Sequence, residues 1–225
     1  FLKNILMDTY LTAWKQASFG EYEGLKQILD NKGGGKFDEQ DDRGFTPLCW
    51  AARNGHLQVM NYLIELGCDK EVASFGGMRP LHHACNKNNE KIIRALIRAG
   101  AEVNAVDENG DCALHYSAAR GVLNIVVALL DAGASFKIAN SQGVLPLHKA
   151  ALFGHVTIVR RLVESGADAD AKDSAGDTAL HIAAKCGFVP IVKFLLDADA
   201  NPSHKNSAGQ TAKDVAANKA IADLL

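Results

Sequence analysis

The sequence predicts an all-α solenoid of helix–turn–helix units with β-turn fingers, about seven units including the two capping ends. Glycine recurs every 33 residues without an insertion, at Gly44, Gly77, Gly110, Gly143, Gly176 and Gly209. A fixed period of this length is typical of stacked copies of one supersecondary unit. Each period also holds a short run of small residues and a longer apolar run, which predict two helices, and no segment has the pattern of a strand.

The finger and the first helix follow from the residues around the periodic glycine. Glycine adopts positive φ without steric cost, as a tight turn requires. In the first complete copy, Thr46 offers an N-cap oxygen, and Pro47 occupies the first helical turn, where a missing N–H is harmless. Small residues such as Ala51 and Ala52 then let neighbouring helices approach closely. We expect Gly55 to end this short helix in the left-handed conformation.

The second helix is longer and strongly apolar, as the run from Leu123 to Leu130 illustrates. It is expected to end at a further glycine, which is Gly67, Gly100, Gly133 or Gly166. Two copies depart from glycine at a helix end. Asn88 replaces it after a short helix, and Asp199 replaces it after a long one. Since one copy cannot cover its own apolar face, the stack of copies is the predicted folding unit.

These copies resemble the ankyrin repeat. The family pattern reads T-P-L-H-x-A-A, then G-H-x-x-I-V-x-x-L-L, then G-A-D, and segments such as QGVLPLHKAALFGHVTIVRRLVESGAD follow it in fixed register. The resemblance covers residues 41–205 and implies a scaffold that binds other proteins. It also implies that the histidines His82, His115, His148 and His181 are structural, each ring bridging backbone and turn groups of adjacent repeats.

The repeat frame divides the chain into one continuous domain with capped ends. Residues 1–10 are an N-terminal extension, which we expect to cap that end as an apolar turn. The predicted units are a capping repeat at 11–40, repeats at 41–73, 74–106, 107–139, 140–172 and 173–205, and a C-terminal capping repeat at 206–225. The chain opens on Phe1 rather than methionine, which indicates a fragment of a longer protein.

Charge and cysteine content restrict the partners and the compartment. Lys and Arg total 24 against 26 Asp and Glu, which argues against sequence-blind nucleic-acid binding or a polybasic membrane anchor. No apolar run approaches the roughly 20 residues that span a bilayer. The five cysteines form no C-x-x-C pair, and free thiols indicate an intracellular protein, cytoplasmic or nuclear. We expect a monomer.

The histidines and thiols predict no catalytic, cofactor or metal site. Equivalent residues of stacked repeats lie roughly 8–10 Å apart, whereas metal ligands converge at about 2 Å from one ion. A nucleophilic cysteine needs a hydrogen-bonded base. Cys49, Cys68, Cys85 and Cys112 are interpreted as small core or cap residues, and Cys186 alone should face outward. An enzyme acting through Cys186 is the less favoured alternative.

The resemblance implies that partners dock on a concave face formed by the turn tips and the exposed side of the short helices. The residues there that the repeat pattern leaves free are the candidate binding residues. They are Arg43, Phe45, Trp50, Arg53, Phe75, Met78, Lys87, Asp111, Tyr116, Arg120, Lys149, Phe153 and Lys185. Phe45, Phe75 and Phe153 are expected to stay exposed, whereas half-burial of Trp50 and Tyr116 against the next repeat is an equal alternative.

These residues predict a protein partner with an acidic and apolar surface. Aromatic residues, Met and Arg are enriched at interface cores. Arg53, Lys87, Arg120, Lys149 and Lys185 form a basic ladder on the short helices, with acidic residues such as Asp42, Glu108, Asp111 and Asp177 at the turn tips. Nucleic-acid binding through the ladder is an alternative. A second alternative is a gankyrin-type proteasome-assembly chaperone, to which FTPLCWAARNGH and GAEVNAVDENGDCALHYSA are similar.

Overall fold

The computed structural model describes residues 13–30 and 37–225. The predicted cap at residues 1–10 lies outside this part of the chain. The described residues form helices and turns with no β-strand, as the sequence predicts. None of their helices is long and apolar enough to cross a membrane. The chain divides into two compact units, Phe1–Glu108 and Asn109–Leu225, which are described separately.

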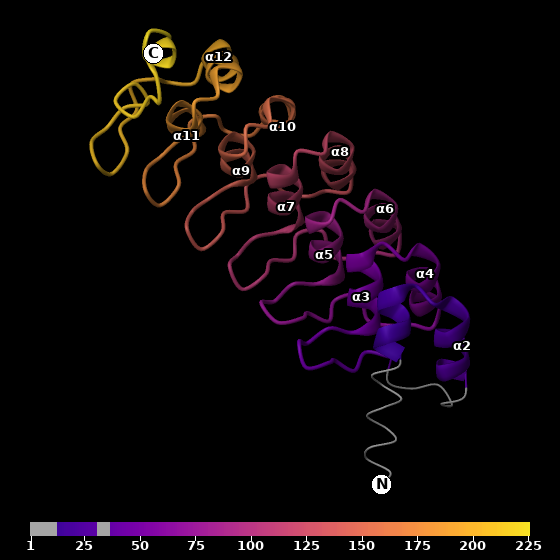
Figure 1. Ribbon diagram of the computed structural model, residues 1–225. Helices are drawn as coiled ribbons and strands as arrows, with labels where there is room; N and C mark the ends of the chain where they lie inside the picture. The colour runs from indigo at the N-terminus through magenta and orange to yellow at the C-terminus, as the bar shows by residue number, and fades with distance from the viewer. Residues whose placement is uncertain (1–12, 31–36) are drawn as a thin grey trace. The chain divides into compact units, whose positions relative to one another are not determined.

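The first unit consists of paired helices joined by fingers. Residues 13–19 are helical and are followed by α2 (Tyr22–Asp30), α3 (Pro47–Asn54), α4 (Leu57–Glu65), α5 (Pro80–Asn86) and α6 (Glu90–Arg98). The short helices α3 and α5 pack side by side, and α2, α4 and α6 form a second row behind them. We call the short helices inner and the long ones outer; the fingers extend from the inner row (Figure 1).

The second unit repeats this arrangement. Its helices are α7 (Ala113–Arg120), α8 (Leu123–Asp131), α9 (Pro146–Leu152), α10 (Val156–Glu164), α11 (Ala179–Cys186), α12 (Val189–Asp197) and α13 (Lys219–Ala222). Inner helices α7, α9 and α11 pack in sequence, as do outer helices α8, α10 and α12 (Figure 1). The short α13 packs on α12.

The helix boundaries confirm the predicted signals. The Thr46 hydroxyl accepts a hydrogen bond from the Cys49 amide at 3.1 Å, so Thr46 caps α3, and Pro47 begins the helix. Gly55 ends α3 with φ +85°. Asn88 and Asp199, where glycine is missing, take the same left-handed conformation with φ of +58° and +60°.

The core lies between the inner and outer rows of each unit. Fully buried side chains come from both rows, as Leu48 and Leu63 in the first unit and Leu129 and Leu147 in the second show. Buried alanines line the contacts between inner helices, because small side chains permit their close approach. Each repeat therefore completes the core of its neighbour.

Each finger is closed by one side chain and then bonded to the next finger. In the first complete finger, the Asp41 carboxylate accepts hydrogen bonds from the amides of Arg43 and Phe45 at 2.9 and 2.8 Å. The Phe75 amide of the next finger donates to the Arg43 carbonyl at 3.2 Å. In the second unit, the Ser174 amide donates to the Gln142 carbonyl at 3.0 Å in the same way. The fingers of each unit thus form a continuous backbone ladder.

The four repeated histidines are structural, as the family resemblance implies. His82 shows the pattern: its Nδ1 accepts from the Arg79 amide at 3.0 Å, and its Nε2 donates to the Ala105 carbonyl at 2.9 Å. Because Nδ1 accepts an amide proton, the ring proton lies on Nε2. His115, His148 and His181 make the equivalent pairs of contacts in the second unit. Burial lowers the pKa of His82 and His148, which keeps these rings neutral.

Candidate functional site

The first unit carries an aromatic stack on its inner face, meaning the surface formed by the fingers and inner helices. Phe45 on the finger and Trp50 on α3 stack with ring centroids 4.6 Å apart and an interplanar angle of 27°. The Trp50 indole N–H donates to the Asp41 carboxylate at 2.9 Å, which fixes the ring. Trp50 is half-buried, but it packs on its own finger.

Phe45 is the centre of this stack, and the expectation that it stays exposed is wrong. Only 7% of its surface is accessible. The ring lies between Trp50 and the His83 ring of α5, whose centroid is 4.7 Å away. Packing against the next inner helix therefore removes Phe45 from the solvent.

Arg53, in the last turn of α3, covers the stack from the solvent side. Its guanidinium carbon lies 5.4 Å from the Phe45 ring centroid and 5.8 Å from the Trp50 ring. Both distances are within the range of cation–π attraction, which holds the cation over the rings. The side chain is half-buried, so its outer edge remains accessible.

His83 closes the base of the stack. The Ser74 hydroxyl donates to the Met78 carbonyl at 3.0 Å, so its oxygen is available to accept from His83 Nε2 at 2.8 Å. Burial, and then the charge of Arg53, lowers the pKa of His83 to about 4. The ring is thus neutral at physiological pH and leaves Arg53 as the cation of the stack.

Two large apolar side chains of the first unit, one on a finger and one at the end of the helix over 13–19, are exposed to solvent. Phe75, at the tip of the finger that follows Gly44, is 72% exposed, as the sequence predicts. Phe19, at the end of the helix over 13–19, is 65% exposed and was missed by sequence analysis. An offset of 35 residues aligns this helix with α3 and places Phe19 at the position of Asn54, the signal that could have identified it.

In the second unit, two acidic finger residues predicted to be free are part of the framework. Asp111 accepts from the Asn140 amide group at 2.8 Å and pairs with the Lys149 ammonium at 3.1 Å. Asp177 accepts from the Asn206 amide group at 2.7 Å. The two amide bonds join one finger to the next, and the Lys149 pair joins a finger to α9, so these side chains stabilise the stack.

The most exposed large apolar side chains of the second unit's described residues lie at the end of α9. Leu152 and Phe153 are 47% and 53% exposed. The Phe153 ring lies 6.5 Å from the His155 ring in a stacked orientation. Phe188, from the next repeat, lies against Gly154, where a built Cβ would come within 2.7 Å of its ring. The expectation that Phe153 stays exposed is confirmed.

The remaining predicted residues do not form one basic ladder. The 33-residue frame puts Arg53 and Lys185 at one register position and Lys87 and Arg120 at the next, whereas Lys149 belongs to a third. Lys87, Arg120, Lys185 and Arg43 are exposed, and Met78 and Tyr116 are half-buried. Each inner helix or its C-cap thus carries one of the cations predicted for the ladder, but at differing positions in the repeat.

The thiols and acidic groups of the described residues do not assemble a reactive centre. No three of their His, Cys, Asp and Glu side chains lie close enough together to hold a metal ion. Cys112 Sγ lies 3.1 Å from His115 Nδ1, but the thiol is fully buried, and burial raises its pKa, which disfavours the reactive thiolate. Burial raises the pKa of Cys49 to about 11 and of Cys68 to about 12, so both are thiols at neutral pH and poor nucleophiles. Cys186 is exposed and the other four cysteines are buried, as predicted.

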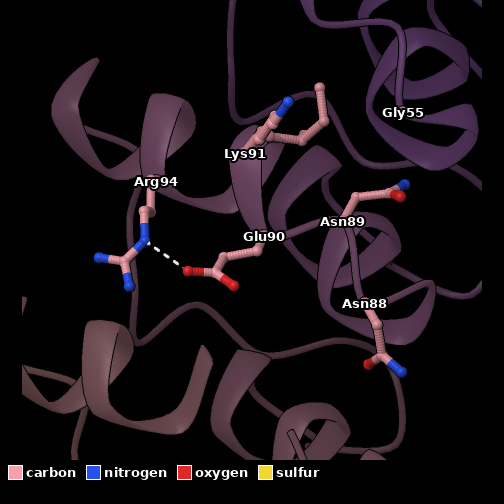
Figure 2. Close-up of a pocket in the computed structure, with 7 residues that line it drawn as sticks. Gly55, Asn88, Asn89, Glu90, Lys91 and Arg94 are labelled. Atoms are coloured by element: carbon pink, nitrogen blue, oxygen red, sulfur yellow. Dashed lines mark hydrogen bonds and ion pairs between the residues drawn. The ribbon is translucent and has the colours of Figure 1, made fainter. Parts of the chain in front are cut away.

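A hollow of about 470 Å³ opens at the turn between α5 and α6 (Figure 2). Asn89 lies toward Gly55 and donates to the carbonyls of Ala52 and Arg53, each at 3.1 Å. Glu90 and Arg94 pair with each other at 2.9 Å on the other side. Its polar groups thus mostly satisfy one another, and we assign it no ligand.

Comparison with solved structures finds the same fold over nearly the whole chain. The ankyrin repeat domain of Bcl-3, described as a unique member of the IkappaB protein family, superposes with a TM-score of 0.84 at 25% identity. It covers 95% of this chain and 96% of that one. The human ASB11 ankyrin repeat domain gives a TM-score of 0.82 at 26% identity, with 95% and 97% covered.

Curated relatives match over shorter segments. The human DNA-binding protein RFXANK is 37% identical over 62 residues, which are 28% of this chain and 24% of that protein. The human NAD-capped RNA hydrolase NUDT12 is 34% identical over 58 residues, 26% of this chain and 12% of that protein. The sequence model of the ankyrin repeats matches in three copies, at residues 14–107, 81–173 and 165–225. The chain therefore belongs to the ankyrin repeat family, whose repeats are protein-interaction scaffolds.

Proposed function

We propose that this protein binds a protein partner through its inner face, the concave face of the family, and that it carries no enzymatic activity of its own. The observation that supports this most directly is the placement of large exposed apolar side chains. Phe19, Phe75, Leu152 and Phe153 all lie at finger tips or at the ends of inner helices. Aromatic side chains such as these phenylalanines are enriched at the cores of protein interfaces, where a partner desolvates them.

The packing explains why these positions are available for function. Stacking uses the faces of each repeat that meet its neighbours, so the finger tips and the ends of the inner helices carry little of the core. Apolar groups there cost solubility without stabilising the fold. A partner that covers them accounts for their presence.

The experiment is affinity capture from cell extract with quantitative mass spectrometry, using one variant for each unit. Phe75→Ser tests the first unit, and Leu152→Ser with Phe153→Ser tests the second. Leu123→Ser is the matched control, because Leu123 is 39% exposed on the outer helix α8. We expect captured proteins to be depleted by the inner-face variants and retained by the control. Equal capture by all variants contradicts the proposal.

Several finer assignments belong to this proposal. We take the protein to be intracellular, because its five cysteines are unpaired, and we take it to be a monomer. A gankyrin-like role, with a proteasomal ATPase as partner, is the alternative suggested by the similar sequence segments. Purified proteasomal ATPase used as prey with the same variants tests it. The name of RFXANK raises DNA binding for this chain too, but exposed aromatic rings and a net charge of −2 favour a protein surface.

A further inference from the structure

We infer that Arg53, held over the Phe45–Trp50 stack, is a recognition site for a carboxylate side chain on an acidic, apolar segment of a protein partner. This inference rests on the proposed function and adds the chemistry of the partner in the first unit. The proposed contact is a bidentate pair between the Arg53 guanidinium and the carboxylate of an Asp or Glu.

Arg53 is pre-organised by the two rings beneath it. These rings are fixed in turn, Trp50 by its bond to Asp41 and Phe45 by the His83 ring on its far side. An arginine held on aromatic faces has already lost much of the conformational freedom that an exposed side chain loses on binding. Binding through this guanidinium therefore carries a reduced entropic cost.

Among the described residues, the Arg53 guanidinium has no hydrogen-bond acceptor, unlike two other arginines of the first unit. Arg79 pairs with Glu71 at 2.8 Å, and Arg94 pairs with Glu90 at 2.9 Å. Within the described residues, the contacts of the Arg53 guanidinium are the two rings, and no oxygen accepts from it. The neighbouring Asp41 is already used by Trp50 and by two finger amides. Because Arg53 is held in place without a counter-ion, we expect the partner to supply the anion.

The geometry of the guanidinium and the charges around it favour a carboxylate as the anion. Five N–H donors in a planar fork match the two oxygens of a carboxylate. Arg53 lies in the last turn of α3, where the helix dipole is negative and disfavours a dianion such as phosphate relative to a single negative charge. Exposed Lys87, at the end of the adjacent α5, adds a second positive charge to the same row. At the finger tip, Asp42 and Arg43 carry opposite charges.

Phe75 offers an apolar contact to the same partner segment. Phe75 belongs to the finger adjacent to that of Phe45, and its ring lies against Gly44, where a built Cβ would come within 2.9 Å of it. With 72% of its surface exposed, it offers an apolar face to the same partner. The expected segment therefore carries an acidic residue close to an aliphatic or aromatic one.

The test is a selection that makes no assumption about the natural partner. A phage-displayed library of random dodecapeptides is selected on the wild-type chain, on Arg53→Gln and on Lys91→Gln. Lys91 is the matched control, because it is an exposed cation on the outer helix α6. We expect peptides from wild type and Lys91→Gln to be enriched in Asp or Glu next to an apolar residue. On Arg53→Gln this acidic enrichment should disappear.

Affinity measurements then test the single contact between Arg53 and the carboxylate. One selected peptide is synthesised with Glu and with Gln at the enriched position, and binding is followed by fluorescence anisotropy. We expect the Glu peptide to bind wild type at least about tenfold more tightly, and both forms to bind Arg53→Gln equally. Arg53→Lys, which keeps the charge but loses the planar fork, should recover only part of the difference.

The outcomes separate this inference from the proposed function. Equal binding of the Glu and Gln peptides to wild type, or a selection without acidic enrichment, overturns the carboxylate site. If Phe75→Ser still weakens that binding, the inner face stands as the docking surface. If Lys91→Gln weakens binding and Phe75→Ser does not, the carboxylate site fails together with the proposed docking surface of the first unit. The Glu-to-Gln change is on the peptide, so the comparison holds even where an Arg53 variant folds poorly.

Discussion

Gly143 lies so close to the next finger that a Cβ on it would meet the Ser174 amide nitrogen at 2.7 Å. Its φ is +69°, a conformation that side chains disfavour. The same clash, with the following finger, occurs at Gly44, Gly77, Gly110 and Gly176. The 33-residue glycine period therefore reflects two requirements at once, a left-handed turn and room for the backbone ladder between fingers.

Gly209 separates these two requirements, because none of the described residues packs against it. Its φ is +76°, yet a Cβ there would meet nothing within 4 Å. Gly209→Ala should cost about 1 kcal/mol, the strain of the left-handed conformation alone. Gly143→Ala should cost more than about 2 kcal/mol, since the finger contact must also open. Urea unfolding followed by circular dichroism measures both, and equal losses would show that the close approach carries no penalty.

Leu129 and Leu123 provide a comparison within one helix, α8. Leu129 is fully buried between the rows, whereas Leu123 is 39% exposed. Leu129→Ala should lower the free energy of unfolding by about 2–5 kcal/mol, because a large-to-small change in a packed core leaves a cavity. Leu123→Ala should cost less than about 1 kcal/mol. A small effect of Leu129→Ala would mean that the core relaxes around the loss.

The sequence was sufficient for the fold because its requirements are local and repeated. Glycine at position 55 predicts a helix end because glycine readily adopts positive φ, and glycine recurs at that position in most copies. The candidate site depends on contacts between distant side chains. Burial of Phe45 requires the His83 ring, and Asp111 is engaged by Lys149, which lies 38 residues away. No periodicity encodes such pairs, so they appear only once the repeats are stacked.

Asp199 ends α12 at φ +60°, where the other complete repeats have glycine. Asp199→Gly should raise the free energy of unfolding by about 0.5–1 kcal/mol, because it relieves the left-handed strain that a Cβ imposes. Asp197→Gly, at the last position of the same helix, is the control and should lower stability instead. Thermal unfolding of the two variants would refute the interpretation if both moved in the same direction.

The neutral, buried His83 makes stability depend on pH in a predictable direction. Burial lowers its pKa from 6.5 to about 4, with Arg53 and His82 adding further repulsion. As the pH falls below 6.5, the unfolded chain binds a proton that the folded chain does not, so stability is lost between these two values. At pH 5 this single group should contribute a loss of about 2 kcal/mol.

His83→Gln tests this contribution, because an amide group can still donate to Ser74 but does not titrate. The variant is expected to be less stable than wild type at pH 7.5, since Phe45 loses the ring that it packs against. The informative quantity is therefore the change between pH 7.5 and pH 5, measured from urea-unfolding midpoints. His82 and His148 are shifted in the same direction and remain in both proteins, so they cancel in the comparison. A drop as large in His83→Gln as in wild type would mean that His83 is charged in the folded protein, and that the stack beneath Arg53 is more open to water than its burial indicates.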